Sequence, residues 1–332
     1  MSNSNSIEAI KRFPFPFAGD SYQYSVNIQP VVNEPILDVD EHYQTEIKLR
    51  NSILDRNKTG RYVNLPHMKT AQWDTLEAIM EDLATHYSQF FTLHQKGDRW
   101  TWENKILNVR DTFAFLDESS LPYEPFEYIA RQVQEDIILL DQREKDLFLD
   151  AGVLTFPTKW SIEFDAGMSF EEFHAPVPRA HQMGVFKKAK SFLRRIEIGK
   201  PWTRRNWTMT VNRRLDTSFE TYPAWGKDRS SVTLDNCGAK VHLRVEVQRF
   251  VRLPRSNSLM FTIHTYLISL EELSINPVWT KRLHEVLKKL PSDIVQYKGL
   301  SRYRDTVLTW LSQNTLEPEY TNLESTVYSR SL

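Results

Sequence analysis

Apolar residues recur at helical spacing in two N-terminal stretches of the chain. In residues 71–92 they fall every three or four positions, which is typical of a helix with one buried stripe. The members of this stripe are Trp73, Leu76, Met80, Leu83 and Tyr87. Residues 124–141 show the same period after Pro125, a residue suited to the first turn of a helix. Their apolar face comprises Phe126, Ile129, Val133, Ile137 and Leu140. The pattern predicts two amphipathic helices.

The next part of the chain carries shorter signals. Residues 152–156 read GVLTF and predict a short buried strand. Ser169 and Glu172 have the spacing of a capping box, which marks a helix start. Pro176 disfavours helical angles at the residue before it. These signals predict a helix of one or two turns with His174 at its end.

Downstream, the pattern predicts a longer helix and then three strands. The helix covers residues 180–197. Apolar and polar residues alternate over 207–211 and 241–248, and a third, more apolar run covers 259–268. Turn-forming residues at 254–257 separate the last two runs, so we expect an antiparallel hairpin there.

Two C-terminal helices complete the pattern, at residues 276–290 and 300–314. The order of strand, short helices, longer helix and three antiparallel strands is typical of a PAS-like domain, in which a sheet and short helices enclose a ligand cavity. The predicted fold class is therefore α+β, with a PAS-like antiparallel sheet flanked by N- and C-terminal helical segments.

These elements divide the chain into four regions that we expect to form one integrated globular unit. Residues 1–40 are rich in proline and aromatic residues and predict an arm that packs on the body. Its aromatic residues are Phe13, Phe15, Phe17, Tyr22 and Tyr24. Residues 41–150 form a helical region, 151–270 the PAS-like core, and 271–332 the C-terminal helices and tail.

Composition removes several function classes. The 332-residue chain is 40% hydrophobic with a formal net charge of -1, so it can build a large core but offers no basic field for nucleic acid or anionic lipid. Cys237 is its single cysteine, which excludes disulfides, zinc knuckles and thiolate-bound iron–sulfur clusters within one chain. No apolar run is long enough to cross a membrane, and no signal-peptide pattern opens the sequence, so we expect a cytoplasmic protein. Glycine-rich phosphate-binding motifs are also absent.

Several segments, taken in order, resemble one family of haem enzymes. They are RFPFPF, YQYSVN, DRWTWEN, QEDIILL, AGVLTFPTKWS, EEFHAPVP, RRNWTM, LRVEVQRFVRLPRS and FTIHTY. Together they extend from about residue 12 to about residue 270. The chain resembles the haem-dependent oxidative N-demethylases, specifically the haem-binding alpha subunit and related bacterial and fungal proteins.

This resemblance implies a PAS-like core that holds b-type haem and activates oxygen at the iron, as a monooxygenase does. It implies electrons from a separate partner protein, a reductase that uses NADPH, flavin or an iron–sulfur centre. The activity of the family is oxidative removal of a methyl group from a small secondary amine, with release of formaldehyde. His264 stands where the family pattern has arginine, so the substrate side or a propionate contact would differ in this chain.

His174 is the candidate axial ligand of the haem iron. Imidazole is a common haem ligand, and a ligand must be held by a rigid element, which the capping signals and Pro176 supply. From the residues alone, the alternative is a histidine that caps the last carbonyls of its own helix. The resemblance favours the ligand.

Arg244, Glu246 and Gln248 share one face of their predicted strand. This is either a solvated face or the lining of a cavity. In a dry cavity Glu246 would bind a cationic amine, because a buried cation needs a counter-charge, and Arg244 would bind a haem propionate.

His264 has two interpretations as well. It is either a hydrogen-bonded sheet histidine or a catalytic group that contacts bound oxygen or substrate. Hairpin register decides which face it takes, because one register places it opposite Glu246 or Gln248 and a one-residue slip places it opposite Val247.

Cationic and amide groups just before the first strand are candidate haem-binding groups. Arg205 and Asn206 suit propionates, whereas Arg204 is either a third donor or surface charge. Trp207 either stacks on the porphyrin or belongs to the core. Cys237 is either an incidental turn residue or a thiolate ligand.

Two function classes follow from the sequence. The first is a haem-dependent oxidoreductase, and the second is a PAS-like sensor that binds haem or a small molecule without turnover, because a fold alone does not give a function. No kinase, cyclase or DNA-binding segment is present to receive a signal. Oxygen consumption that depends on substrate would separate the two. A third possibility is that the chain acts only within a larger complex.

Overall fold

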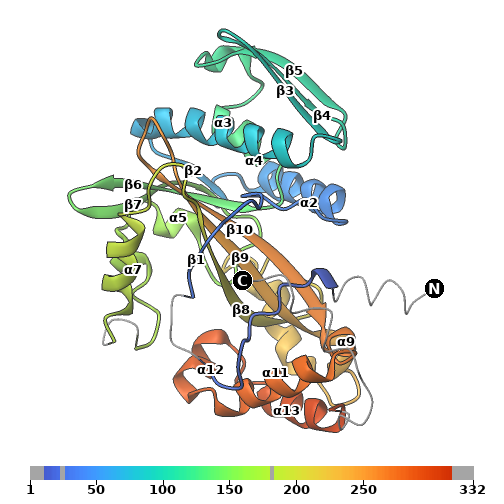
Figure 1. Cartoon of the computed structure of the whole chain (residues 1–332). Coiled ribbons are helices and arrows are strands. Elements are labelled where there is room, and N and C mark those ends of the chain that lie inside the picture. Colours follow the sequence, from blue (N-terminus) through green and yellow to red (C-terminus); the bar gives the residue numbers. More distant parts are fainter. Residues whose placement is uncertain (1–10, 23–26, 180–182, 316–332) are drawn as a thin grey trace.

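A large antiparallel sheet runs through the middle of the protein (Figure 1). The computed structural model describes residues 11–22, 27–179 and 183–315. Seven strands pair in the order β1-β8-β9-β10-β6-β7-β2, and every pairing is antiparallel. Their bounds are Gln29–Pro30 (β1), Tyr62–Asn64 (β2), Asp136–Arg143 (β6), Asp146–Val153 (β7), Trp202–Val211 (β8), Val241–Arg252 (β9) and Leu259–Ser269 (β10).

A second, three-stranded sheet lies beyond α3 at one end of the molecule (Figure 1). Its strands are Phe91–Lys96 (β3), Arg99–Asn104 (β4) and Val109–Ala114 (β5). The helices of this end are Tyr43–Arg56 (α2), Lys69–His86 (α3) and Pro125–Ala130 (α4), with short 3-10 turns at Pro66–Met68 (η1) and Glu118–Ser120 (η2). One apolar cluster joins α3 to both sheets, through Trp73 and Leu76 on the helix, Trp102 on β4 and Leu139 on β6. Burial of this cluster fixes α3 between the two sheets.

The C-terminal helices cover the other end of the large sheet. They are Leu270–Leu273 (α10), Pro277–Lys289 (α11), Ser292–Lys298 (α12) and Arg304–Gln313 (α13), together with Cys237–Lys240 (α9) before β9. The N-terminal arm packs on the same end, as its aromatic residues predict. Phe15 stacks on Trp279 at 4.6 Å between ring centroids, and Phe17 meets Trp207 edge-on at 4.9 Å. Tyr24 lies outside the described residues.

Short helices, which follow β7 and precede β8 along the chain, cover the side of the sheet opposite to the C-terminal helices. They are Ile162–Asp165 (α5), Phe170–Phe173 (α6) and Val185–Leu193 (α7). Tyr222–Trp225 (α8) and the 3-10 helix Gly226–Ser231 (η3) follow β8. Phe170, Phe173 and Phe186 from this group pack against Leu149 on β7 and Phe250 on β9. This third apolar cluster holds the end of α6, and therefore His174, against the sheet.

The predicted helix at 71–92 is confirmed as α3 up to His86, whereas residues 91–92 already belong to β3. The strands at 207–211, 241–248 and 259–268 are confirmed as β8, β9 and β10. The expected hairpin joins β9 to β10. The longer helix predicted for 180–197 appears as α7, although residues 180–182 lie outside the described residues. The capping box of Ser169 and Glu172 is also present. Local side-chain signals were sufficient for these elements.

The helix predicted for 124–141 is wrong beyond Ala130, because residues 136–143 form β6 in the middle of the sheet. Residues 137–140 read IILL and are all buried, as expected of a central strand with both faces covered. Ile137 and Leu140 fall by chance at helical spacing from Phe126, Ile129 and Val133, and this imitated a helical stripe. Residues 41–150 are therefore not mainly helical, since they contain β2 to β6 and part of β7.

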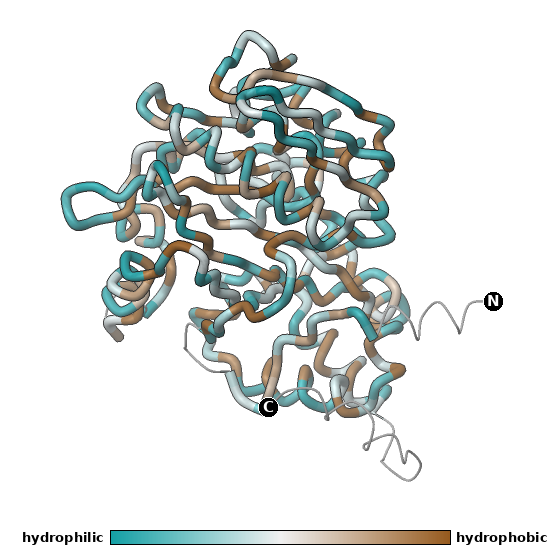
Figure 2. The backbone as a smooth tube through the Cα atoms, turned by 45° about the horizontal axis from the view of Figure 1, so that its top comes forward, coloured by the Kyte–Doolittle hydropathy of each residue, from teal (hydrophilic) through white to brown (hydrophobic). Residues whose placement is uncertain are grey.

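Two smaller predictions differ at their edges. The short strand expected at 152–156 is the end of β7, which begins at Asp146 and ends at Val153. The C-terminal helices expected at 276–290 and 300–314 are α11 and α13, and the sequence pattern missed α12 between them. Figure 2 shows that the hydrophobic positions gather along the central strands, whereas the projecting tip of the β6–β7 hairpin is hydrophilic.

Candidate functional site

Strand β9 presents two chemically different faces. Arg244, Glu246 and Gln248 point to the side that the short helices cover, which we call the Glu246 face. Val247 points to the opposite side and pairs with His264 on β10, so we call that side the His264 face. The register is thus the one that places His264 opposite Val247. Glu246 and His264 lie on opposite sides of the sheet.

Glu246 is the centre of a buried polar network. Its carboxylate accepts hydrogen bonds from Asn206 Nδ2 at 3.2 Å, Gln248 Nε2 at 3.1 Å and Thr158 Oγ1 at 3.4 Å. Arg244 Nε donates to it at 3.3 Å. Because Arg244, Glu246 and Gln248 are all buried, the alternative of a solvated sheet face is wrong. Four donors hold this carboxylate in one orientation.

The hydrogen-bond donors of Arg244 are used mainly by neighbouring groups of the protein itself. It is fully buried, and its guanidinium donates to Leu215 O at 2.7 Å, to Phe156 O and to Thr265 Oγ1 at 3.1 Å. A guanidinium has five N–H groups, and these three contacts together with the one to Glu246 use most of them. Arg244 therefore orients Glu246 and the strand ends around it.

His174 lies directly after α6, at its C-cap. Its Nδ1 donates to Phe170 O at 2.8 Å, and its ring packs against Phe170, Phe173 and Phe186 with centroid distances of 4.3 to 4.7 Å. The hydrogen bond is the capping contact expected from the residues alone. The same bond places the proton of a neutral imidazole on Nδ1 and its lone pair on Nε2, which is how ligand histidines are oriented.

Two connections place His174 and Glu246 on the same side of the sheet. Residues 158–160 form the first, because Thr158 contacts Glu246 while Trp160 meets the His174 ring edge-on at 5.8 Å. The second is an ion pair between Arg179, which follows His174, and Asp293 on α12. The ligand candidate, the carboxylate and α12 are therefore parts of one region.

Sequence reasoning missed two lysines in this region. Lys159 Nζ donates to Tyr297 O at 2.7 Å, and Lys298 Nζ donates to Trp207 O at 2.6 Å. Burial and the charge of Arg229 lower the pKa of Lys159 to about 8. Burial, with Arg204 and Lys159 nearby, lowers the pKa of Lys298 to about 7. The only sequence signal was a lysine within the aromatic segment FPTKW, since α12 itself was not predicted.

The residues at 205–207 alternate between the two faces. Asn206 joins Glu246, as described above, whereas Arg205 is exposed and donates to Phe15 O at 3.2 Å. Trp207 packs with Phe17 in the C-terminal core, and Lys298 Nζ lies 4.4 Å from the centre of its ring. Of these three, only Asn206 is brought together with Glu246.

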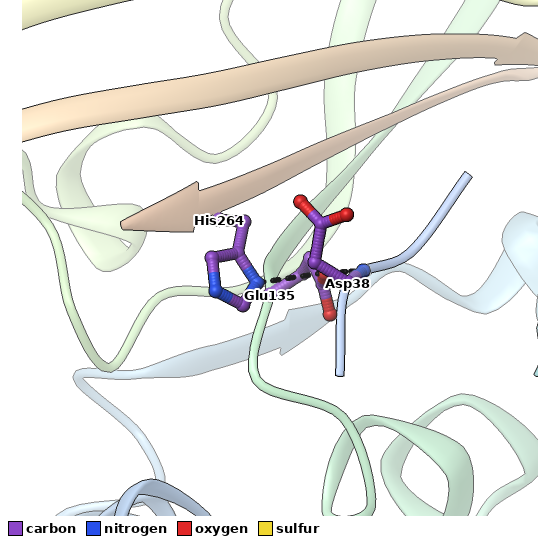
Figure 3. Close-up of side chains that lie close together, drawn as sticks. All are labelled: Asp38, Glu135 and His264. Carbon is purple, nitrogen blue, oxygen red and sulfur yellow. Dashed lines mark hydrogen bonds and ion pairs between the residues drawn. The ribbon is translucent and has the colours of Figure 1, made fainter. Parts of the chain in front are cut away.

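His264 belongs to a separate buried cluster (Figure 3). Its Nδ1 lies 2.9 Å from Glu135 Oε1, and its Nε2 lies 3.4 Å from Asp40 Oδ2. Burial opposes charge on the imidazole, but Glu135, Asp40 and Asp38 outweigh it and raise the pKa of His264 well above its ordinary value. His264 is thus an imidazolium that donates to two carboxylates.

The same cluster ties an N-terminal segment to the sheet. Asp38 N donates to Glu135 Oε1 at 2.7 Å, and the Asp38 carboxylate accepts from Arg249 at 3.0 Å and from Tyr266 at 2.9 Å. Asp38, Glu135 and His264 are close enough to share a metal ion. However, Arg249 and the imidazolium already balance two of these carboxylates, so we assign the cluster a structural role. We call it the His264 clasp.

Two other features fall outside this region. Cys237 is buried, and burial raises the pKa of its thiol to about 11, which opposes the thiolate needed for iron ligation. A cleft of about 260 Å³ lies between the end of α7 and the start of β8, lined by residues that include Phe192 and Trp202. Neither His174 nor Glu246 lines it.

The fold and these contacts define an α+β protein with a polar, partly buried site on one face of an antiparallel sheet. The family described as haem-dependent oxidative N-demethylase, alpha subunit-like, matches residues 27–308, a stretch that contains all seven strands of the large sheet. The chain belongs to this family, which confirms the resemblance seen in the sequence motifs. The family name indicates a haem-dependent oxidative enzyme of the demethylase type. Among the described residues, no helix is long and apolar enough to cross a membrane.

Proposed function

We propose that this protein is a haem-dependent, oxygen-activating oxidoreductase that removes a methyl group from a small amine and releases formaldehyde. A separate reductase, carrying flavin or an iron–sulfur centre and oxidising NADPH, would supply the electrons. The single observation that carries the proposal is the joint placement of His174 and Glu246 on one side of the sheet, in a chain of this family.

A PAS-like core is part of the proposal. Five neighbouring strands, in the order β7-β6-β10-β9-β8, support it, with the short helices α5 to α7 inserted between the second and third strands along the chain. In this arrangement the core begins at β6, Asp136, rather than at residue 151. The inserted helices cover the Glu246 face, where a PAS-like domain would hold its ligand.

The residues of the Glu246 face fit a haem group. A haem needs an axial donor, cations for its propionates and an apolar surround, and the region offers His174, the cations Arg204, Lys159 and Lys298, and the aromatic rings around α6. A bound haem would supply the iron at which oxygen is reduced. The chain would hold it through His174 Nε2, with Nδ1–H fixed on Phe170 O so that the ring cannot rotate.

Glu246 would select the substrate. In a dry site, a protonated amine needs a counter-charge, and a carboxylate held by Asn206, Gln248 and Thr158 is already oriented to accept its N–H groups. The same oxygens would take up the proton when the amine becomes neutral. His264 takes no part in this scheme, because the sheet separates it from Glu246.

Absorption spectroscopy tests the cofactor first. The purified chain reconstituted with haemin should show a Soret band, and His174→Ala should abolish or shift it, whereas His94→Ala on the outer strand β3 should leave it unchanged. A wild-type chain without a Soret band would refute the proposal. An unchanged spectrum for His174→Ala would remove this residue as the ligand.

Turnover is tested with a reductase, NADPH and dimethylamine as the probe. Oxygen consumption that depends on the amine, with formaldehyde released, supports the enzyme. Haem binding without turnover on any small secondary or tertiary amine would instead support the sensor.

A further inference from the structure

Three cations gather beside Glu246 without a carboxylate of their own. Arg204 on β8 shares the Glu246 face, since it pairs with Gln248, and Lys298 reaches the same edge of β8 from α12. Lys159 directly precedes Trp160, the residue in contact with His174. Within the described part of the chain, none of the three cations forms an ion pair within 4.0 Å. The nearby carboxylate of Glu246 is already paired with Arg244 at 3.3 Å.

Hydrogen bonds to backbone carbonyls stabilise the positive charges of these three side chains only in part. Lys159 and Lys298 each donate to one carbonyl, at 2.7 and 2.6 Å, and these contacts do not neutralise an ammonium group. Lys159 also lies near the C-terminal end of α12, where a helix dipole favours cations. No such contact accounts for Arg204, whose Nε is buried and lacks a hydrogen-bond partner. Like charges held together out of water are costly unless an anion joins them.

We propose that Arg204, Lys159 and Lys298 bind the two propionate carboxylates of haem. This inference rests on the proposed function and adds which edge of the porphyrin faces which part of the fold. The propionate edge would lie at β8 and α12, with Glu246 adjacent to it. Two carboxylates would compensate the unpaired positive charge and supply the missing acceptor for Arg204 Nε. Arg205, one of the sequence-based candidates for this role, contacts the N-terminal arm instead.

The position of α12 agrees with this assignment. The ion pair between Arg179 and Asp293 attaches α12 to the segment that follows His174, and Lys298 lies five residues further along the same helix. A haem whose iron is bound by His174 would therefore have α12 as a neighbour. Thr208 on β8 also donates to Lys298 O at 3.4 Å, which places the end of α12 beside the Glu246 face.

Titration with haemin and with haemin dimethyl ester, in which both carboxylates are blocked, tests the inference. We expect the wild-type chain to bind haemin at least about tenfold more tightly than the ester, since hydrogen bonds between charged groups are the stronger ones and the ester offers no charged acceptor. Lys298→Met and Arg204→Met should each weaken haemin binding by about tenfold and leave ester binding unchanged. Lys96→Met, on the exposed end of β3, is the matched control and should change neither.

The titrations distinguish failure of the propionate assignment from failure of haem binding itself. Equal affinity for haemin and ester in the wild-type chain would overturn the inference while leaving haem binding intact. Equal weakening of haemin and ester by the substitutions, with a lowered melting temperature, would show that these cations stabilise the fold and would also overturn it. A wild-type chain that binds neither compound would refute the proposed function itself. The position of the Soret band should stay constant in all lysine and arginine variants, because His174 is unaltered.

Discussion

Replacing His264 with leucine removes the cation at the centre of the His264 clasp. His264 and Glu135 are both 0% exposed, so the substitution leaves a buried carboxylate without its cationic partner. Breaking a buried charge pair by removing one side costs about 3–5 kcal/mol. Unfolding entropy is about 2.1 cal/mol/K per residue, which for a 332-residue chain unfolding as one unit makes this loss a drop of about 4–7 °C in melting temperature.

The drop should depend on pH in a defined direction. The pKa of His264 is raised in the folded protein, so its stabilising contribution is complete below the unfolded pKa of about 6.5 and declines as pH rises through the folded value. The pKa values of Asp38 and Asp40 are lowered, because Arg249 and His264 outweigh burial, so their contribution is lost only as pH falls below about 3.8. The difference between wild type and variant should therefore be largest between about pH 4 and pH 6.5 and shrink above that range.

Thermal unfolding followed by circular dichroism at several pH values measures this difference. His94→Leu, on the small outer sheet, is the control and should shift the melting temperature by little at any pH. The double variant His264→Leu with Glu135→Gln should recover part of the loss, since the unpaired carboxylate is gone. A melting temperature within about 1 °C of wild type at pH 6, or a difference that grows with pH, would refute the reasoning.

Three further predictions concern the Glu246 face and the sheet beside it. Glu246→Gln should raise KM for the amine at least about tenfold while the Soret band persists, measured by steady-state kinetics, because only the counter-charge is lost. Haemin affinity should fall as pH rises from about 7 to 9, checked by titration in that range, because burial lowers the pKa of Lys298 to about 7 and only its protonated form attracts carboxylates. Gly152→Ala should lower stability by about 1–3 kcal/mol in denaturant unfolding, since an added Cβ would lie 2.7 Å from Ile162 Cδ1 and 3.2 Å from Ile137 O.

Local patterns were enough for part of the fold. Alternation identified β8 to β10, and the capping box at Ser169 placed the end of a short helix at His174. Both signals depend only on neighbours within one element. Residues 137–140 were misread because four consecutive apolar residues satisfy a helical stripe as well as a strand buried on both faces.

The site could be predicted only as far as its local signals reached. His174 and Glu246 were found because each stands out within its own segment. Lys298 and Lys159 were missed because their significance arises from the docking of α12, a contact between residues 138 positions apart. The sequence did not decide which side of the sheet His264 faces, for a related reason. A one-residue slip of the hairpin reverses that side, and only long-range packing fixes the register.

The contact between Lys159 and α12 also has a consequence for how the protein is made. The Glu246 face draws its groups from Thr158 to Lys298, so synthesis must pass residue 298 before the last of them is available. The sheet and the His264 clasp need nothing beyond Ser269 and can assemble earlier. The Glu246 face would therefore be completed only when α12 packs beside a sheet that has already formed.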